Sequence, residues 1–202
     1  MTAPDPVAST PLTARPEVLD FLATRRSRPA KTLTAPAPDR AALTPLLAMA
    51  LRVPDHGKLE PWRLIVLERG ALDRLARLAG QRAEAAGLAP DQAAKGIAQF
   101  ADSPLCVAVV SVPRDTAKVP EWEQVLSAGA AAAALCNAAQ AAGWGACWLT
   151  GWPAYERGFL AEGLALAEGE RIAGFVHIGT ETSLPPDRPR PDPETAIDWR
   201  AA

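Results

Sequence analysis

This chain of 202 residues contains little of what common chemistries need: only two histidines, three cysteines and no excess of basic residues. Its 21 Lys and Arg against 23 Asp and Glu give a formal net charge of -2 at pH 7. Nucleic acids and anionic membranes normally require a basic face, so we expect neither as a partner. The N-terminus lacks the apolar segment of a secretory signal, and we expect residues 1–14 to form a flexible arm.

A membrane-spanning segment is also not expected. A long uncharged stretch, residues 126–152, has the length needed to cross a bilayer. However, Asn137, Gln140 and the dominance of Ala and Gly favour a buried, closely packed helix that leads into a strand.

The cysteines are odd in number and have no metal-ligand spacing. Cys106 and Cys147 lie in apolar, strand-like runs, and Cys136 lies in the Ala-rich helical run. Free, buried thiols in a reducing cytoplasm fit this pattern best.

Several catalytic motifs are absent. The chain has no G-x-G-x-x-G between a strand and a helix, no G-x-x-x-x-G-K-[ST], no H-E-x-x-H and no G-x-S-x-G. His56 and His177 are 121 positions apart, so a zinc site would have to be assembled from scattered ligands. We therefore expect no metal site and no hydrolase triad.

Hydrophobic periodicity predicts helices interleaved with four or five short strands. The expected helices cover residues 16–25, 71–87, 91–101, 120–142 and 153–167, and the expected strands cover residues 63–68, 105–112, 146–150 and 174–180. The alternation is not a regular βαβ pattern, so we expect an α+β fold with one central sheet.

One further helix, in residues 42–53, contains Pro45. Either this helix begins with Thr44 as its cap and Pro45 as its first residue, or its first turn is distorted.

Two short stretches have the chemistry of a ligand site, but each also has a purely structural explanation. Residues 25–28 (RRSR) combine three guanidinium groups with a hydroxyl and can hold a phosphate dianion. Arginines at the end of a helix can equally well complement its dipole. In residues 147–151 (CWLTG), a strand ends in a loop with backbone N–H groups available for binding, although a helix stop before a buried strand explains the same residues.

A third stretch, residues 52–66 (RVPDHGKLEPWRLIV), places Asp55 beside His56 in a turn-rich segment. Neighbouring side chains in a turn rarely point at each other, so a catalytic Asp–His pair is not favoured.

Taken together, these stretches resemble the FMN-dependent nitroreductase family, and most closely its small, minimal-length bacterial branch. The similarity rests on the R-R-S helix end, A-L-R-V-P-D-H-x-x-x-E-P-W-R, V-P-E-W-E-Q-x-x-S-A-G-A, G-W-G-A-C-W-L-T-G and G-F-V-H-I-G-T. They occur in the family's order between residues 16 and 193. The resemblance implies a mainly antiparallel mixed sheet flanked by helices, with a C-terminal arm that extends onto a partner subunit.

The resemblance also implies a homodimer with FMN at the subunit interface. NADH or NADPH would reduce the flavin at N5, and a nitroaromatic, a quinone or a similar acceptor would reoxidise it by a ping-pong route. The flavin would carry the chemistry, so no catalytic side chain is implied.

The family's cofactor-binding positions correspond to several residues of this chain. Arg25, Arg26 and Ser27 match the segment that holds the ribityl phosphate. Arg52 and His56 match positions that reach FMN from the other subunit.

Trp148, Leu149 and Thr150 match the loop that lies along the isoalloxazine. Arg190, or alternatively Arg188, matches a late basic residue that closes on the phosphate.

Some features depart from the wider family or leave the function open. Lys58 and Glu60 replace an amide pair of the wider family, and Gly57 allows a ring or backbone to approach closely. A flavin carrier or sensor without turnover, and another flavin reaction such as dehalogenation or flavin fragmentation, remain alternatives. We expect residues 15–202 to form one FMN-binding domain, with residues 181–202 as its proline-rich arm.

A dimer is also consistent with the residues themselves. The small residues of SAGAAAAALCNAAQAAG let another backbone approach closely, and Ile197 and Trp199 near the chain end favour docking on a surface. Both features are also compatible with packing inside one chain.

Overall fold

The structure, a computed structural model, describes residues 11–201, so most of the arm expected over residues 1–14 lies outside the described residues. Seven α-helices are described: α1 (Pro16–Thr24), α2 (Arg40–Ala50), α3 (Arg69–Ala85), α4 (Pro90–Ala101), α5 (Glu121–Ala141), α6 (Arg157–Leu164) and α7 (Pro193–Ala196). Short 3-10 helices occupy Ala30–Thr32, His56–Lys58 and Trp152–Ala154. The strands are β1 (Leu33–Thr34), β2 (Trp62–Leu67), β3 (Leu105–Ser111), β4 (Gly145–Leu149) and β5 (Arg171–Glu181).

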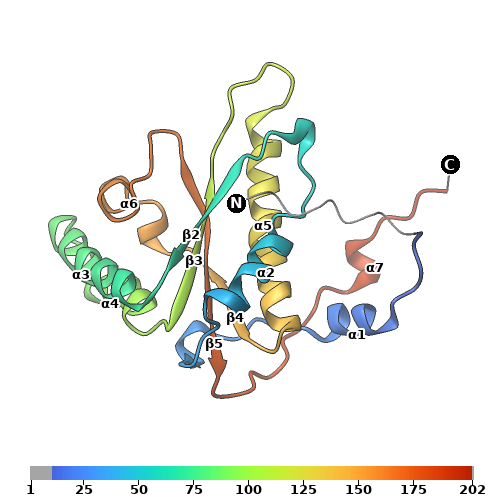
Figure 1. The fold of residues 1–202 in the computed structure, drawn as a ribbon, viewed down its shortest axis with the longest axis horizontal. Helices are drawn as coiled ribbons and strands as arrows, with labels where there is room; N and C mark the ends of the chain where they lie inside the picture. Colours follow the sequence, from blue (N-terminus) through green and yellow to red (C-terminus); the bar gives the residue numbers. More distant parts are fainter. Residues whose placement is uncertain (1–10, 202) are drawn as a thin grey trace.

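The five strands form one antiparallel sheet around β5, the longest strand. β5 pairs with β1, β3 and β4, and β3 also pairs with β2 at the outer edge. Helices cover both faces: α3, α4 and α6 lie on one side, and α2 and α5 on the other (Figure 1). This is the expected α+β architecture.

The two faces of the sheet have separate cores because successive side chains of a strand point to opposite sides. In β3, Cys106 and Val110 join the core under α3, α4 and α6. Leu105 and Val107 join the core under α2 and α5. Every residue of β3 is buried, as expected for a strand with helices on both sides.

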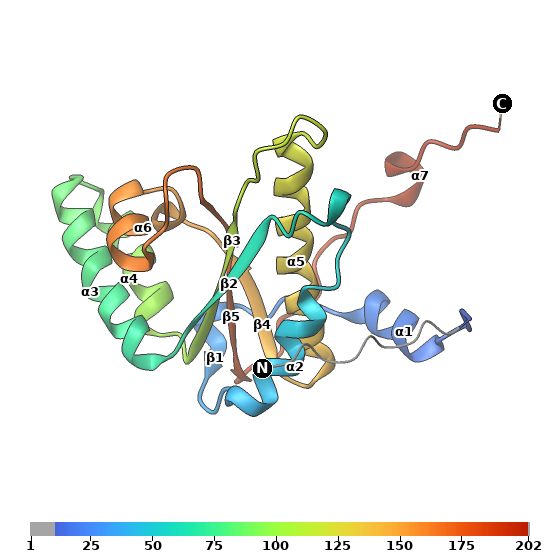
Figure 2. The same cartoon turned by 45° about the horizontal axis from the view of Figure 1, so that its top comes forward.

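α1 and the C-terminal segment project from this body on the α5 side (Figure 2). None of the residues of α1 is buried, and residues 186–201 are exposed throughout. Ile197 and Trp199 are 49% and 87% exposed. Within the described residues, no helix combines the length and apolar character needed to cross a membrane.

Of the two alternatives for the second helix, the start with Thr44 as cap was wrong. α2 begins at Arg40, and the Asp39 carboxylate accepts a hydrogen bond from Ala42 N at 2.8 Å as its N-cap. Pro45 therefore lies inside the helix, and the Thr44 hydroxyl donates to the Arg40 carbonyl instead of capping.

Three smaller differences concern short elements. β1 lies in a connection for which no strand was expected, and α6 is shorter than the helix expected over residues 153–167. A single helical turn, α7, forms in the proline-rich tail, where no compact element was expected.

Candidate functional site

The end of α1 presents Arg25, the first of the predicted phosphate-binding residues. Its backbone N–H closes the helix on Phe21 O at 2.8 Å. Its side-chain Nε is buried, and no hydrogen-bond partner for it lies within residues 11–201. Arg25 lines a cavity of about 230 Å³ between the end of α1 and the end of α5, together with Arg28, Gln140 and Gly143. A buried cationic donor without a partner is suited to an anionic ligand.

The structure brings the predicted late basic residue, Arg190, close to Arg26. Both side chains approach the Asp187 carboxylate, Arg190 Nη2 at 2.7 Å and Arg26 Nε at 3.9 Å. Arg26 Nε also donates to Pro186 O at 3.2 Å. The backbone N–H of Arg188 and the Arg190 side chain lower the pKa of Asp187 below its usual value. Two guanidinium groups from distant parts of the chain thus share one carboxylate. Like a phosphate, a carboxylate is an anionic group that accepts hydrogen bonds from arginine.

The turn after Arg25 carries Ser27, which is half-buried, and runs alongside β4. Arg28 N donates to Ala146 O at 2.9 Å, and this bond ties the turn to the strand. The fold therefore places Arg25–Ser27 next to β4, which ends at the predicted flavin-contacting residues.

At the end of β4, Leu149 and Thr150 line a cavity of about 440 Å³. Its other lining residues come from α4, from β4 itself and from the segment after β4: Gln92, Lys95, Gly96, Gln99, Trp148, Gly151 and Trp152. Leu149 and Lys95 also line a neighbouring cavity of about 260 Å³ that reaches Ala30 and Lys31. The two cavities share Lys95, Gln99 and Leu149, and together they extend from Ala30 and Lys31 to the end of β4.

Trp148 is fixed in place, although it is 39% exposed. Its indole Nε1 donates to Ala173 O at 3.1 Å. The ring lies over Gly174, where any side chain would overlap it. Trp148 is therefore a rigid aromatic surface at this end of the sheet.

Lys95 and Gln99 were not predicted as site residues. They lie on α4, and Lys95 makes no ion pair with any described residue. The sequence contains one signal, Gly96 inside a helical pattern, because an interior glycine often marks a close approach. The Trp152 indole occupies the space that a Gly96 side chain would need, and this contact brings α4 against the loop after β4.

Residues 52–60, called the lip below, adopt a strained and heavily hydrogen-bonded conformation. Gly57, Lys58 and Glu60 have φ of 75°, 54° and 47°, in the left-handed region that non-glycine residues rarely adopt. Asp55 compensates: its two carboxylate oxygens accept hydrogen bonds from Leu59 N at 3.1 Å and Glu60 N at 2.9 Å. The Asp55 side chain thus supports its own loop and does not pair with His56.

His56 pairs with a residue far away in sequence. Its Nδ1 lies 2.7 Å from Oε2 of Glu123, in the first turn of α5, and its side chain is 62% exposed. Arg52 is also exposed and makes no ion pair within residues 11–201. The two predicted partner-contacting residues therefore lie on an exposed surface.

The lip and the Arg25 cavity lie at opposite ends of α5. His56 contacts Glu123 in its first turn, whereas Arg25 shares a cavity with Gln140 near its end. These positions are about 25 Å apart at the rise of an α-helix. The structure therefore brings Arg25–Ser27, Arg190 and Trp148–Thr150 to one region, and it does not bring Arg52 and His56 there.

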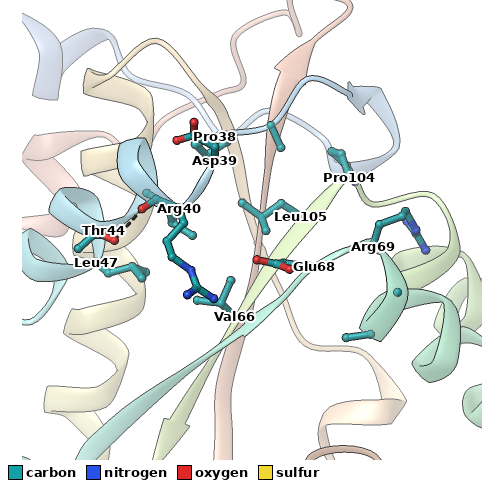
Figure 3. A pocket seen from close by; sticks show the side chains of 14 residues that line it. Pro38, Asp39, Arg40, Thr44, Leu47, Val66, Glu68, Arg69, Pro104 and Leu105 are labelled. Carbon is teal, nitrogen blue, oxygen red and sulfur yellow. Dashed lines mark hydrogen bonds between the residues drawn. The ribbon is translucent and has the colours of Figure 1, made fainter.

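A cavity of about 650 Å³ lies between α2, β2 and the start of α3, and no predicted site residue lines it (Figure 3). Several of its polar groups already have structural partners. The Thr44 hydroxyl donates to Arg40 O at 2.6 Å, and Arg69 bonds Asp73, Phe100 O and Ser103 O. Among the described residues, none that lines this cavity has a buried side-chain donor without a partner, in contrast to Arg25 with its Nε.

Metal and thiol chemistry find no support in the described residues. No group of three or more His, Cys, Asp or Glu within them could hold a metal ion. The three cysteines are buried and unpaired, and burial raises the pKa of Cys136 to about 12. Burial also raises the pKa of Cys106 and Cys147, so none of these thiols is a ready nucleophile.

Comparisons with known proteins identify relatives along most of the chain. A sequence profile described as "Nitroreductase family" matches residues 22–180. A Haemophilus influenzae protein named "Putative NAD(P)H nitroreductase" is 37% identical over 166 residues, which are 81% of this chain and 88% of the relative. The Escherichia coli K12 protein "Putative NAD(P)H nitroreductase YdjA" is 36% identical over the same shares.

Solved structures have the same fold at lower identity. A nitroreductase-like protein from Bacillus cereus superposes with a TM-score of 0.75 at 23% identity and covers 96% of this chain and 100% of its own. A nitroreductase with bound FMN from Bacteroides fragilis gives a TM-score of 0.70 at 19% identity and covers 91% and 98%.

Proposed function

The chain belongs to the nitroreductase family, and we propose that it is a homodimeric, FMN-dependent NAD(P)H oxidoreductase that reduces nitroaromatic, quinone or similar acceptors. Residues 15–202 form its single FMN-binding domain. The observation that carries the proposal is the division of the candidate cofactor residues into two sets at opposite ends of α5. Each set presents cationic groups, and neither makes a complete site alone.

The set near Arg25 fits the phosphate end of FMN. Arg25 provides a buried, unpartnered Nε beside a polar cavity. Ser27 adds a hydroxyl, and Arg26 and Arg190 already share the carboxylate of Asp187. In this proposal the FMN phosphate recruits these groups, because charge-assisted hydrogen bonds to phosphate are stronger than those between neutral groups.

The end of β4 fits the ring of FMN. Trp148, Leu149 and Thr150 would lie along the isoalloxazine, next to the 440 Å³ cavity. When bound, FMN supplies the two-electron chemistry between NADH or NADPH and the acceptor. The chain positions the ring and limits its access to water, and Lys95 is a cation available beside the ring.

The second set, Arg52 and His56, would complete the site of the other subunit. A dimer accounts for several exposed apolar side chains on the α1–α5 side of the molecule. Leu19, Leu22 and Trp122 are 65%, 51% and 63% exposed. Exposed apolar surface of this kind commonly marks a protein–protein interface. The C-terminal arm, residues 181–202, would extend onto the partner through Ile197 and Trp199.

A reducing cytoplasm is the proposed location. Three buried cysteines remain unpaired, which is typical of proteins from reducing compartments.

The flavin part of this proposal is tested by colour and redox behaviour. Purified protein is expected to be yellow, to release FMN on heating and to bleach when NADH or NADPH is added under nitrogen. A nitroaromatic, a quinone or an enone is then expected to restore the colour. A colourless protein that takes up no FMN would contradict the proposal, and flavin that no acceptor reoxidises would indicate a carrier or sensor.

The Arg25→Gln variant tests the phosphate site. It is expected to bind FMN roughly 10- to 100-fold more weakly, because a charge-assisted hydrogen bond contributes about 1.5–3 kcal/mol. Arg40→Gln is the matched control, since Arg40 is an exposed arginine that lines the separate 650 Å³ cavity. Equal losses in both variants would argue against a phosphate site at Arg25.

Subunit complementation tests the shared site. Arg25→Gln and His56→Ala subunits are each expected to retain FMN poorly as homodimers. A mixed dimer should contain one intact site, built from the unchanged Arg25 of one subunit and the unchanged His56 of the other. Mixed dimers that retain FMN no better than the homodimers, or sedimentation of the native protein as a monomer, would contradict a site shared between subunits.

A further inference from the structure

The first turns of α5 hold the lip through two direct contacts and through one that passes by way of Arg114. The Ser127 hydroxyl donates to Pro54 O at 2.7 Å. The Gln124 amide accepts from Arg114 N at 2.7 Å, and the Arg114 guanidinium donates to Leu59 O and Glu60 O. The third contact is the 2.7 Å pair between Glu123 and His56. The lip therefore lies beside the N-terminal end of α5 (Figure 1).

These contacts have different consequences for the lip. Those of Gln124 and Ser127 fix its backbone, whereas that of Glu123 acts on the one imidazole ring in the lip. An ionised carboxylate has no hydrogen to donate, so the proton of this hydrogen bond must be on Nδ1 of His56. The pair thus uses one ring nitrogen and leaves Nε2 as the only remaining polar atom of the ring. A carboxylate on Nδ1 commonly sets the orientation and tautomer of a functional histidine.

We propose that Glu123 is a positioning residue for His56: it holds the ring through Nδ1 so that Nε2 is directed at the FMN bound by the partner subunit. This inference rests on the proposed function, and it adds a residue for which no cofactor contact was expected. Without Glu123, the largely exposed ring would sample several rotamers and would have to be ordered each time FMN binds.

The α5 helix also offers a matched control for this role. Glu121 lies in the same first turn and pairs with Arg171 at 3.1 Å. It shares the charge of Glu123 and its location at the end of α5, but its partner is a different one. A general effect of acidic residues near the helix N-terminus would involve Glu121 and Glu123 alike.

A double-mutant cycle on the full-length protein, with the FMN dissociation constant as readout, tests the inference. Glu123→Ala is expected to weaken FMN binding roughly fivefold in the native background, and less than about twofold when His56 is already alanine. Glu123→Gln keeps an acceptor for Nδ1 and should restore binding to within about twofold of native. Glu121→Ala should leave the dissociation constant unchanged, and thermal unfolding of each variant reports whether it folds.

Three outcomes of this experiment would overturn the inference. A Glu123→Ala loss that persists in full in the His56→Ala background would show that Glu123 does not act through His56. An equal loss in Glu121→Ala would assign the effect to charge at the helix end, and a silent Glu123→Ala would remove the role altogether. If the native protein binds FMN and Glu123→Ala leaves the dissociation constant unchanged, only this inference is refuted. If the native protein binds no FMN, the proposed function is refuted as well.

Discussion

The two histidines of this chain occupy opposite kinds of surroundings. His177 lies in the middle of β5, fully buried, with Cys106 of β3 and Cys147 of β4 as its cross-strand neighbours. His56 lies on the lip, with a side chain that is 62% exposed and paired with Glu123. The residue type is the same in both places, and the surroundings give it different roles.

Hydrogen-bond partners define the difference further. The Ser103 hydroxyl donates to Leu105 O, so it must accept from Nδ1 of His177, which lies 2.9 Å away. Nε2 of His177 is buried and has no partner within the described residues. In His56 the Nδ1 proton also has an acceptor, but Nε2 belongs to a side chain that is 62% exposed. The interior ring is therefore a neutral packing group, and the lip ring keeps one nitrogen available to a ligand.

The largest expected difference between the two histidines is in acid. Burial lowers the pKa of His177 from 6.5 to about 4. Between these values the unfolded chain binds more protons than the folded one, so stability falls as the pH falls from about 6.5 to about 4. The expected loss from this residue is about 3 kcal/mol.

Urea titrations across that pH range, at one protein concentration, measure this loss. In the His177→Leu variant, the part of the stability loss in acid that comes from His177 should disappear. The His56→Leu variant should lose as much stability in acid as the native protein. The comparison fails if His177→Leu loses as much stability in acid as the native protein.

A somewhat smaller effect is expected from the hydroxyl that pairs with the interior histidine. Ser103→Ala leaves the Nδ1–H of His177 buried without an acceptor, which costs about 1–3 kcal/mol in free energy of unfolding. Glu123→Ala, the corresponding change at the lip, should cost less than about 0.5 kcal/mol because water replaces the carboxylate. Equal losses in free energy of unfolding for Ser103→Ala and Glu123→Ala, measured by urea titration, would show that burial does not determine the cost of losing the histidine's partner.

An effect at the lower end of the range expected for Ser103→Ala concerns the lip backbone. Asp55→Ala removes the acceptor for two backbone N–H groups and should cost about 1 kcal/mol, as loss of a capping side chain does. The change is expected to appear as faster amide hydrogen exchange at Leu59 and Glu60, with little change at β3. Uniform acceleration across the protein would contradict a local role for Asp55 and would mean that the lip opens only with the whole fold.

The sequence predicted the long, periodic elements of the fold well. Most expected helices and strands are present, because hydrophobic repeats over many residues leave few alternatives. Short elements were missed: β1 has only two residues, and its pairing with Thr180 and Glu181 is a long-range contact. Thr44 was a possible cap because proline is best tolerated in the first turn of a helix, whereas the actual cap is Asp39 and Pro45 lies inside α2.

Candidate site residues could be proposed from the sequence, but their arrangement in space could not. The motifs identified which residues to consider, including Arg25 and His56. No local pattern could show that His56 pairs with Glu123, 67 positions away, or that Asp55 instead supports its own loop. Lys95 was missed for the same reason, since only the folded chain brings α4 beside the end of β4.

The central claim is that the lip binds the cofactor and does not carry out the chemistry. It is tested most directly by His56→Ala, with both the FMN dissociation constant and the rate of anaerobic bleaching by NADH or NADPH at saturating FMN as readouts. The account predicts a roughly 10-fold rise in the dissociation constant, at least about fivefold larger than any fall in the bleaching rate. A large fall in the bleaching rate at full flavin occupancy, with unchanged FMN affinity, would contradict it and return His56 to a catalytic role.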